Sequence, residues 1–164
     1  VRRMTDNPIR LEANNRFERL DFTADSLNAL FDHLQSSRPD HGLAGELSLA
    51  FLNDAELASI HADFLSDPTP TDVITFPGNA VEGFAGEICV SVERAENEAL
   101  TRDDLLEREL TLYLIHGWLH LVGFDDIEDE DRSLMREAER DSMSSIEKVG
   151  LVPDFRLAPK LLAE

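Results

Sequence analysis

Short strand-type runs fill the first part of the sequence, and longer helical patterns fill the second. The predicted strands are "IRLEAN" (9–14), "ELSLAFL" (46–52), "DVITFP" (72–77) and "EICVSV" (87–92), in which alternating or β-branched apolar residues dominate. From about residue 92 onward, apolar residues recur at helical spacing. This order predicts an α+β fold, with about five helices packed on a mixed sheet of about four strands.

The helices are predicted from three- and four-residue apolar spacing and from residues that start or stop a helix. The predicted ranges are 23–38, 55–65, 92–100, 101–123 and 129–150. Thr23 is the expected N-cap of the first, and Thr101 with Asp104 resembles a capping box for the fourth. Gly123 and Gly150 are expected to end the last two helices. Residues 151–164 read as a loosely held tail.

The length of 164 residues fits one domain, 1–164, which can bury a core without disulfides. Cys89 is the only cysteine, so no intramolecular disulfide and no cysteine-based zinc framework is available. No apolar run approaches the ~20 residues that span a bilayer, and the first residues lack the apolar core of a signal peptide. We therefore expect a cytoplasmic protein without a membrane partner.

The charge balance is strongly acidic, with 34 Asp and Glu against 15 Lys and Arg, and a net charge of -19. Such a field opposes general attraction to nucleic acid, so no DNA partner is expected. An RNA substrate would require a local positive feature, and a bound metal ion is one.

The stretch "HGWLHLVGFDD" (116–126) carries a candidate metal site. His116 and His120 lie four residues apart on a predicted helix, so both imidazoles can reach one ion. Gly123 can turn the chain back and deliver Asp126 to the same point, as in the metzincin pattern. The alternative is an apolar core helix, in which the two ring nitrogens would still need buried partners. A metal ion supplies that partner, which favours the metal site.

Two histidines and one aspartate leave an open coordination position, which is the catalytic arrangement of zinc. Iron(II) and manganese remain alternatives, but the nitrogen-rich ligands and the zincin-like spacing favour Zn²⁺. Zinc proteases of the HExxH type carry a general-base glutamate directly after the first histidine, where this chain has Gly117. Peptide hydrolysis is therefore disfavoured, whereas water activated by a metal could attack a phosphodiester.

Three stretches together resemble one known family. "HGWLHLVGFDD" is similar to the metal-site signature of the YbeY family, "PTDVITFP" (70–77) to its strand motif, and "AGEICVSVERA" (85–95) to its G-D-I-x-I-S segment. The resemblance covers roughly residues 45–140. It implies a zincin-like fold, one zinc ion per chain, and a single-strand-specific endoribonuclease. It also implies maturation of the 16S rRNA 3′ end and ribosome quality control, with rRNA, the small ribosomal subunit and ribosome-assembly proteins as partners.

The chain departs from the family pattern at two places. Asp126 stands where the family has a third histidine, which should weaken the Lewis acidity of the metal. Leu65 and Asp67 stand where the family has a cleft-lining arginine and lysine, which weakens the case for phosphate binding. Arg94 or Arg102 could compensate for the missing arginine.

The predicted site therefore has His116, His120 and Asp126 as metal ligands and catalytic residues. Asp125 could assist ligand orientation or proton transfer, or only cap the turn. Thr71 and Asp72 could contact substrate, although such a pair at a strand entry is as often structural. Two other functions stay open: a zinc-stabilised ribosome-assembly factor with weak or no nuclease activity, and a metallohydrolase for another substrate.

Overall fold

The computed structural model describes residues 9–65 and 71–161. The strands are β1 (Ile9–Asn15), β2 (Leu20–Asp21), β3 (Gly45–Leu52), β4 (Val73–Asn79), β5 (Phe84–Ser91) and β6 (Arg156–Leu157). The helices are α1 (Ala24–Ser37), α2 (Asp54–Leu65), α3 (Val92–Arg102), α4 (Leu106–Leu121) and α5 (Asp129–Lys148). Two short 3₁₀ turns, Pro39–His41 and Ala80–Glu82, complete the described elements.

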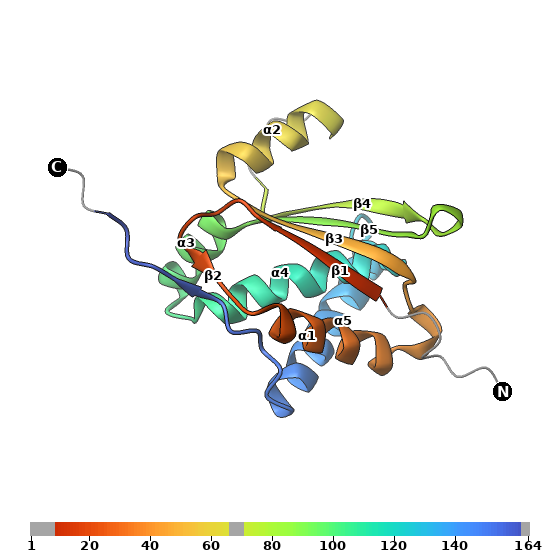
Figure 1. The fold of residues 1–164 in the computed structure, drawn as a ribbon. Coiled ribbons are helices and arrows are strands. Elements are labelled where there is room, and N and C mark those ends of the chain that lie inside the picture. The colour runs from red at the N-terminus through yellow and green to blue at the C-terminus, as the bar shows by residue number, and fades with distance from the viewer. Residues whose placement is uncertain (1–8, 66–70, 162–164) are drawn as a thin grey trace.

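The main sheet is mixed and has four strands in the order β1-β3-β5-β4. β1 and β5 both run parallel to β3, whereas β4 runs antiparallel to β5 and forms an edge of the sheet. The predicted α+β class, the sheet of about four strands and the set of about five helices are confirmed by this arrangement (Figure 1).

The two faces of the sheet are covered unequally (Figure 1). The helices α1, α4 and α5 lie on one face, and the main core forms between them and alternate strand residues such as Leu49 and Phe51. The helix α2 lies on the opposite face, where Leu57 packs with Ala50 and Leu52 of the same strand. Alternation along β3 thus supplies both cores, because successive side chains of a strand point to opposite faces.

The helix α4 lies directly under the sheet, and its apolar sequence follows from that position. Trp118 is fully buried, and its indole nitrogen donates a hydrogen bond to Oε1 of Gln35 at 3.3 Å. Gly117 faces the sheet so closely that an added Cβ would lie 2.6 Å from Cγ2 of Ile88 on β5. The small residue at 117 therefore allows the close contact between helix and sheet.

The boundary between α3 and α4 differs from the prediction. Thr101 was expected to cap a helix of residues 101–123, but it lies in the last turn of α3 and donates to the Asn97 carbonyl at 2.9 Å. Asp103 then adopts a positive φ of 53° and ends α3, and the chain changes direction before α4 begins at Leu106. The capping-box interpretation of Thr101 and Asp104 is therefore wrong. Local spacing could not reveal that the hydroxyl bonds back into the preceding helix.

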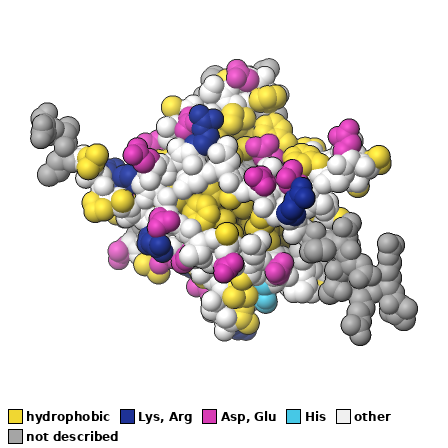
Figure 2. All heavy atoms as spheres, viewed as in Figure 1, with side chains coloured by type: hydrophobic (Ala, Val, Ile, Leu, Met, Phe, Trp, Pro, Cys, Tyr) yellow, Lys and Arg dark blue, Asp and Glu magenta, His cyan; other side chains and the backbone are white. Residues whose placement is uncertain are grey.

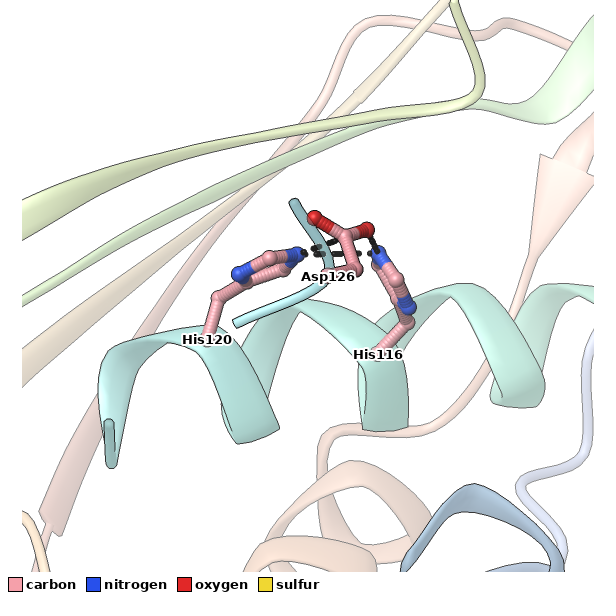
Figure 3. Close-up of side chains that lie close together, drawn as sticks. All are labelled: His116, His120 and Asp126. Carbon is pink, nitrogen blue, oxygen red and sulfur yellow. Dashed lines mark hydrogen bonds and ion pairs between the residues drawn. The ribbon is translucent and has the colours of Figure 1, made fainter. Parts of the chain in front are cut away.

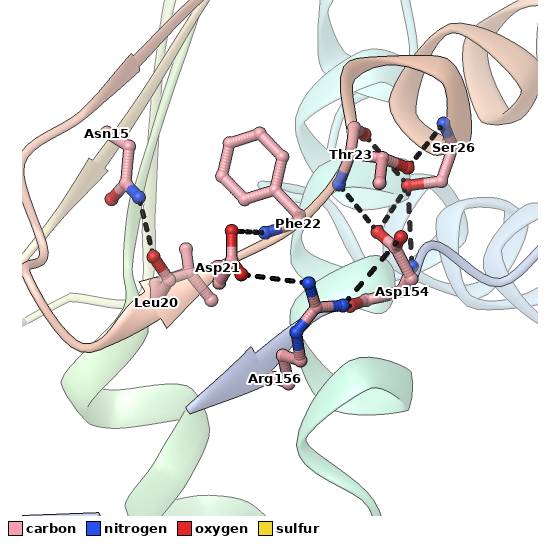
Figure 4. A network of polar contacts seen from close by, with 8 residues as sticks. All are labelled: Asn15, Leu20, Asp21, Phe22, Thr23, Ser26, Asp154 and Arg156. Carbon is pink, nitrogen blue, oxygen red and sulfur yellow. Dashed lines mark hydrogen bonds and ion pairs between the residues drawn. The ribbon is translucent and has the colours of Figure 1, made fainter. Parts of the chain in front are cut away.

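The C-terminal segment is also held more firmly than the sequence predicts, over the residues that are described. Phe155 is 4% exposed and packs in the main core, and β6 pairs antiparallel with β2. Asp154 accepts hydrogen bonds from the Thr23 amide at 2.8 Å and the Ser26 hydroxyl at 2.7 Å, at the start of α1 (Figure 4). The expectation of a loosely held tail does not hold for residues 151–158, whereas residues 159–161 are exposed.

Among the described residues, no helix is both long enough and apolar enough to cross a membrane.

Candidate metal centre

The centre of the candidate site is a pair of imidazoles on one face of α4. His116 and His120 stand one helical turn apart, and both rings rise from the helix toward the same point (Figure 3). Their Nε2 atoms lie 3.1 Å from each other, and the rings meet nearly edge to face. Both side chains are only partly buried, so the pair lies at the surface of α4 and not in the core.

Asp126 reaches this point because the chain reverses directly after α4. Gly123 follows the C-cap residue Val122 with a positive φ of 112°, as the sequence predicted for the end of this helix. The carboxylate oxygen Oδ2 of Asp126 lies 3.6 Å from Nε2 of His116 and 3.5 Å from Nε2 of His120. Figure 3 shows the carboxylate above both rings, so helix and turn together present three donor atoms to one point.

The spacing of these three atoms fits a metal ion. Zinc binds histidine nitrogen and carboxylate oxygen at about 2.0–2.2 Å, so tetrahedral ligands lie roughly 3.3–3.6 Å apart. The three observed separations lie at or close to this range, and the three donor atoms all fall within 4.8 Å of one another. Two nitrogens and one carboxylate oxygen are also a donor set that catalytic zinc and iron(II) sites use.

Glu139 of α5 is a site residue that sequence reasoning missed. Its carboxylate contacts Nδ1 of His116, opposite to the nitrogen that faces Asp126. Burial lowers the pKa of His116, but the hydrogen bond and the charge of Glu139 outweigh burial and leave that pKa raised. Because Nδ1–H donates to Glu139, the Nε2 lone pair stays available for a metal. Glu139 follows His116 by 23 residues, so no local spacing signals the contact.

A pocket of about 390 Å³ opens beside His116. Both Thr71 and Asp72 line it, which places the predicted substrate residues next to the metal ligands. Thr71 also donates weakly to the Val73 carbonyl at 3.4 Å, which is the structural role considered for it. The geometry is thus compatible with substrate contact by both residues, and that role stays a prediction.

Asp125 is not brought into the cluster. Asp125 is exposed in the turn after α4, and its carboxylate accepts a hydrogen bond from the Asp126 amide at 2.7 Å. This contact stabilises the turn that presents Asp126, which is the capping role named as an alternative. A direct role of Asp125 in catalysis stays a prediction.

Two arginines line the same pocket as His116. Arg102 pairs with Glu98 at 3.1 Å and with Glu109 at 3.4 Å, and Arg94 lies 3.8 Å from Asp54. Both guanidinium groups therefore already face carboxylates. The second departure from the family pattern, at Leu65 and Asp67, falls on Asp67 and the side chain of Leu65, which lie outside what the structure describes.

The lining of this pocket includes a buried acid. Glu109 is 3% exposed, and burial raises its pKa, which the charge of Arg102 partly opposes. Burial also raises the pKa of the neighbouring Tyr113, and the negative charge of Glu109 adds to that rise. With Asp72, Glu98, Glu109 and Glu139 against two arginines, the pocket beside the metal ligands carries more acidic than basic side chains.

Comparison with known proteins places this geometry in a family. The family model described as "Endoribonuclease YbeY" matches residues 12–147, which include all three candidate ligands. The fold is similar to the solution structure of TM1509 from Thermotoga maritima, with a TM-score of 0.60 and 25% sequence identity. That match covers 87% of this chain and 91% of the other.

Curated relatives agree with the family model. A protein of Protochlamydia amoebophila named "Endoribonuclease YbeY" is 34% identical over 145 residues, covering 86% of this chain and 95% of the relative. A protein of the same name from Fusobacterium nucleatum is 36% identical, over 70% of this chain and 72% of the relative. Another protein of that name, from Chlamydia trachomatis, is 37% identical over 74% of this chain and 76% of the relative. The chain therefore belongs to the YbeY family of endoribonucleases.

Proposed function

We propose that this chain is a zinc-dependent endoribonuclease that cuts single-stranded rRNA, with the metal held by His116, His120 and Asp126. Membership in the family makes the chain a metal-dependent hydrolase that acts on phosphodiester bonds of RNA. The identity of the ion, the three ligand roles and the rRNA substrate are the parts that this proposal adds.

One observation carries the proposal: three donor atoms from a helix and the following turn converge at separations of 3.1 to 3.6 Å. Two of them are imidazole nitrogens, which favours zinc over magnesium or calcium. Held by His116, His120 and Asp126, a divalent ion would supply a lowered pKa for water and polarisation of a phosphoryl oxygen of the substrate. Three protein ligands leave a coordination position for such chemistry.

The surrounding residues have distinct tasks in this proposal. Glu139 holds the proton on Nδ1 of His116 and so fixes the ring with Nε2 toward the site. The turn that Asp125 stabilises presents Asp126. Thr71 and Asp72 border the pocket in which a phosphodiester would lie, within reach of His116.

Gly117 is consistent with nuclease rather than protease chemistry. HExxH proteases need a glutamate at this position as general base. Here the position faces β5, and even a Cβ would meet Ile88 at 2.6 Å. A general base at this position has no room, so proton transfer must involve other groups.

The biological substrate that we propose is the 3′ end of 16S rRNA on the small ribosomal subunit, with ribosome-assembly proteins as partners. Work on the ribosome would place the protein in the cytoplasm. The three-motif resemblance to the YbeY family supports these assignments.

Single-turnover cleavage tests the proposal. Zinc-loaded protein is mixed in excess with a labelled single-stranded rRNA fragment and with the same sequence as a duplex. We expect cutting of the single strand, loss on chelation, recovery with zinc, and loss in His116→Ala and His120→Ala. The control His33→Ala removes a histidine that contacts Ser145 outside the cluster. Equal cutting by wild type and both ligand variants, all folded by circular dichroism, would contradict the proposal.

A further inference from the structure

A second hollow of about 730 Å³ lies between α4 and α5. We call it the α4–α5 groove, and its charged lining consists of Arg108, Arg136, Arg140 and Lys148 against Glu139 and Glu147. Basic side chains thus outnumber acidic ones in this groove, in a chain whose net charge is -19.

Three of these cations are available for a ligand. Within residues 9–65 and 71–161, Arg136, Arg140 and Lys148 form no ion pair. Every other Lys or Arg in these ranges pairs with a carboxylate, except Arg38, which lies over the Phe124 ring. On the face drawn in Figure 2, basic side chains likewise lie beside acidic ones. The three unpaired cations in one groove are therefore unlike the rest of the described surface.

The groove leads to the candidate metal centre. Leu112 and Glu139 line both the groove and the pocket beside His116. The contacts of Arg108 with Glu147 and of His116 with Glu139 show that α4 and α5 run antiparallel along it. Eight residues separate Arg108 from His116, or ~12 Å of helix. At ~3.4 Å per phosphate of a stacked strand, this length fits three to four phosphates.

The pocket beside His116 cannot supply this attraction itself, because its carboxylates outnumber its two arginines and both arginines are paired. A polyanion that approaches the metal centre therefore needs cations from a neighbouring surface. From the unpaired side chains and the shared lining, we propose that the α4–α5 groove binds the phosphate backbone of the RNA next to the scissile bond. This inference rests on the proposed function and names the surface that holds the substrate.

RNA is favoured over an acidic protein segment because the groove continues into the nuclease site. Arg136 and Arg140 lie one turn apart on α5, and both are exposed. Such a row of cations suits the evenly spaced phosphates of an RNA strand. It provides no base-specific recognition, since phosphate contacts position a strand without reading its sequence. The groove would then position any single strand for cutting.

The test uses the triple variant Arg136→Ala/Arg140→Ala/Lys148→Ala in the metal-loaded full chain. Single-turnover cleavage at rising protein concentration gives the half-saturating concentration and the limiting rate separately, and fluorescence anisotropy gives binding. We expect the half-saturating concentration to rise roughly 10- to 100-fold at 0.1 M salt, and the slope of log K against log salt to become shallower by about 2. The limiting rate should stay within about twofold, because the metal ligands are untouched.

The matched control is Arg10→Ala/Arg16→Ala/Arg156→Ala, which removes the same charge from exposed ion pairs outside the groove. Equal effects of both triple variants would overturn the groove while leaving the nuclease proposal intact. Poly-glutamate that competes as well as RNA of equal charge would also overturn it. If wild type binds RNA with the expected salt slope but never cuts, the groove stands and the nuclease proposal fails.

Discussion

Glu139 on α5 contacts Nδ1 of His116 on α4, so one imidazole connects the antiparallel pair α4 and α5 to the candidate metal centre. The contact sets which ring nitrogen carries the proton and which one faces Asp126. It also fixes the ring orientation at the place where the pocket beside His116 meets the α4–α5 groove. Packing of α5 against α4 is thereby linked to the geometry of the three donor atoms.

Glu139→Gln should weaken metal binding by about 10- to 100-fold, which is typical when a partner of a ligating histidine is changed. The amide cannot stabilise the positive charge that the ring gains on binding a metal. Competition with a chromophoric chelator measures this affinity without any assay of cutting. Glu137→Gln removes the same charge from an exposed position of the same helix and serves as the control. Unchanged affinity in Glu139→Gln would show that its contact with His116 does not support the metal centre.

Asp126→His should keep metal binding and shift the pH dependence of cleavage toward lower pH. A neutral imidazole leaves more positive charge on the ion than a carboxylate does, which favours deprotonation of water at lower pH. The midpoint of the single-turnover pH–rate profile measures the shift, and the absorption spectrum of the cobalt-loaded protein checks the ligand exchange. Asp129→His, on an exposed side chain, is the control. A midpoint that does not move would argue against Asp126 as a ligand.

Gly117→Ala should destabilise the protein. The new Cβ would lie 2.6 Å from Cγ2 of Ile88, whose side chain is fully buried and unable to retreat freely. Overpacking costs about 1–3 kcal/mol, and the better helix propensity of alanine offsets about 1 kcal/mol of that. Thermal unfolding should therefore show a lower Tm.

Two further variants make this prediction specific. Gly117→Ala combined with Ile88→Ala should cost less than the sum of the single changes, since the second change makes room for the first. Gly42→Ala, which would meet only ordinary contacts at 3.6 Å, should leave Tm nearly unchanged. Additive losses in the double variant would mean that the close approach to Ile88 is not the cause.

Asp154→Ala should release the C-terminal segment from α1. Hydrogen bonds from the Thr23 amide and the Ser26 hydroxyl lower the pKa of Asp154 (Figure 4). A lowered folded-state pKa means that this contact stabilises the fold above the unfolded pKa and is lost as pH falls through the folded pKa. The effect should be small, because the carboxylate is exposed to solvent.

Trypsin cleavage after Arg156 measures this release, and it should be faster in Asp154→Ala than in wild type at pH 7. The Thr23 amide shift, followed by NMR, should titrate at acidic pH in wild type and stay flat in the variant. Asp21→Ala removes an exposed ion-pair partner of Arg156 and leaves the α1 contacts intact. Equal proteolysis rates in all three proteins would show that Asp154 does not hold the segment, and would assign its docking to Phe155 and the pairing of β6 with β2.

Much of the fold was predictable because its signals are local. The apolar spacing in 23–38 reflects the helix face that this segment buries, and the apolar pattern in 46–52 reflects burial in the sheet. The helix α1 and the strand β3 therefore begin and end within a residue or two of their predicted bounds. The Thr101 capping box failed because the same residues suit the end of one helix and the start of the next. The docked C-terminal segment was missed because its partners, Thr23 and Ser26, lie more than a hundred residues earlier.

The sequence by itself determined the three converging donors of the site. His116 and His120 share a helix face through their four-residue spacing, and Gly123 allows the turn that presents Asp126. Only the tertiary structure decided what surrounds them. Glu139 reaches His116, and the unpaired cations of α5 line a groove toward it, because α5 folds back along α4. Contacts of this kind depend on how two helices pack against each other, and the spacing of residues along the chain does not encode which side chains then meet.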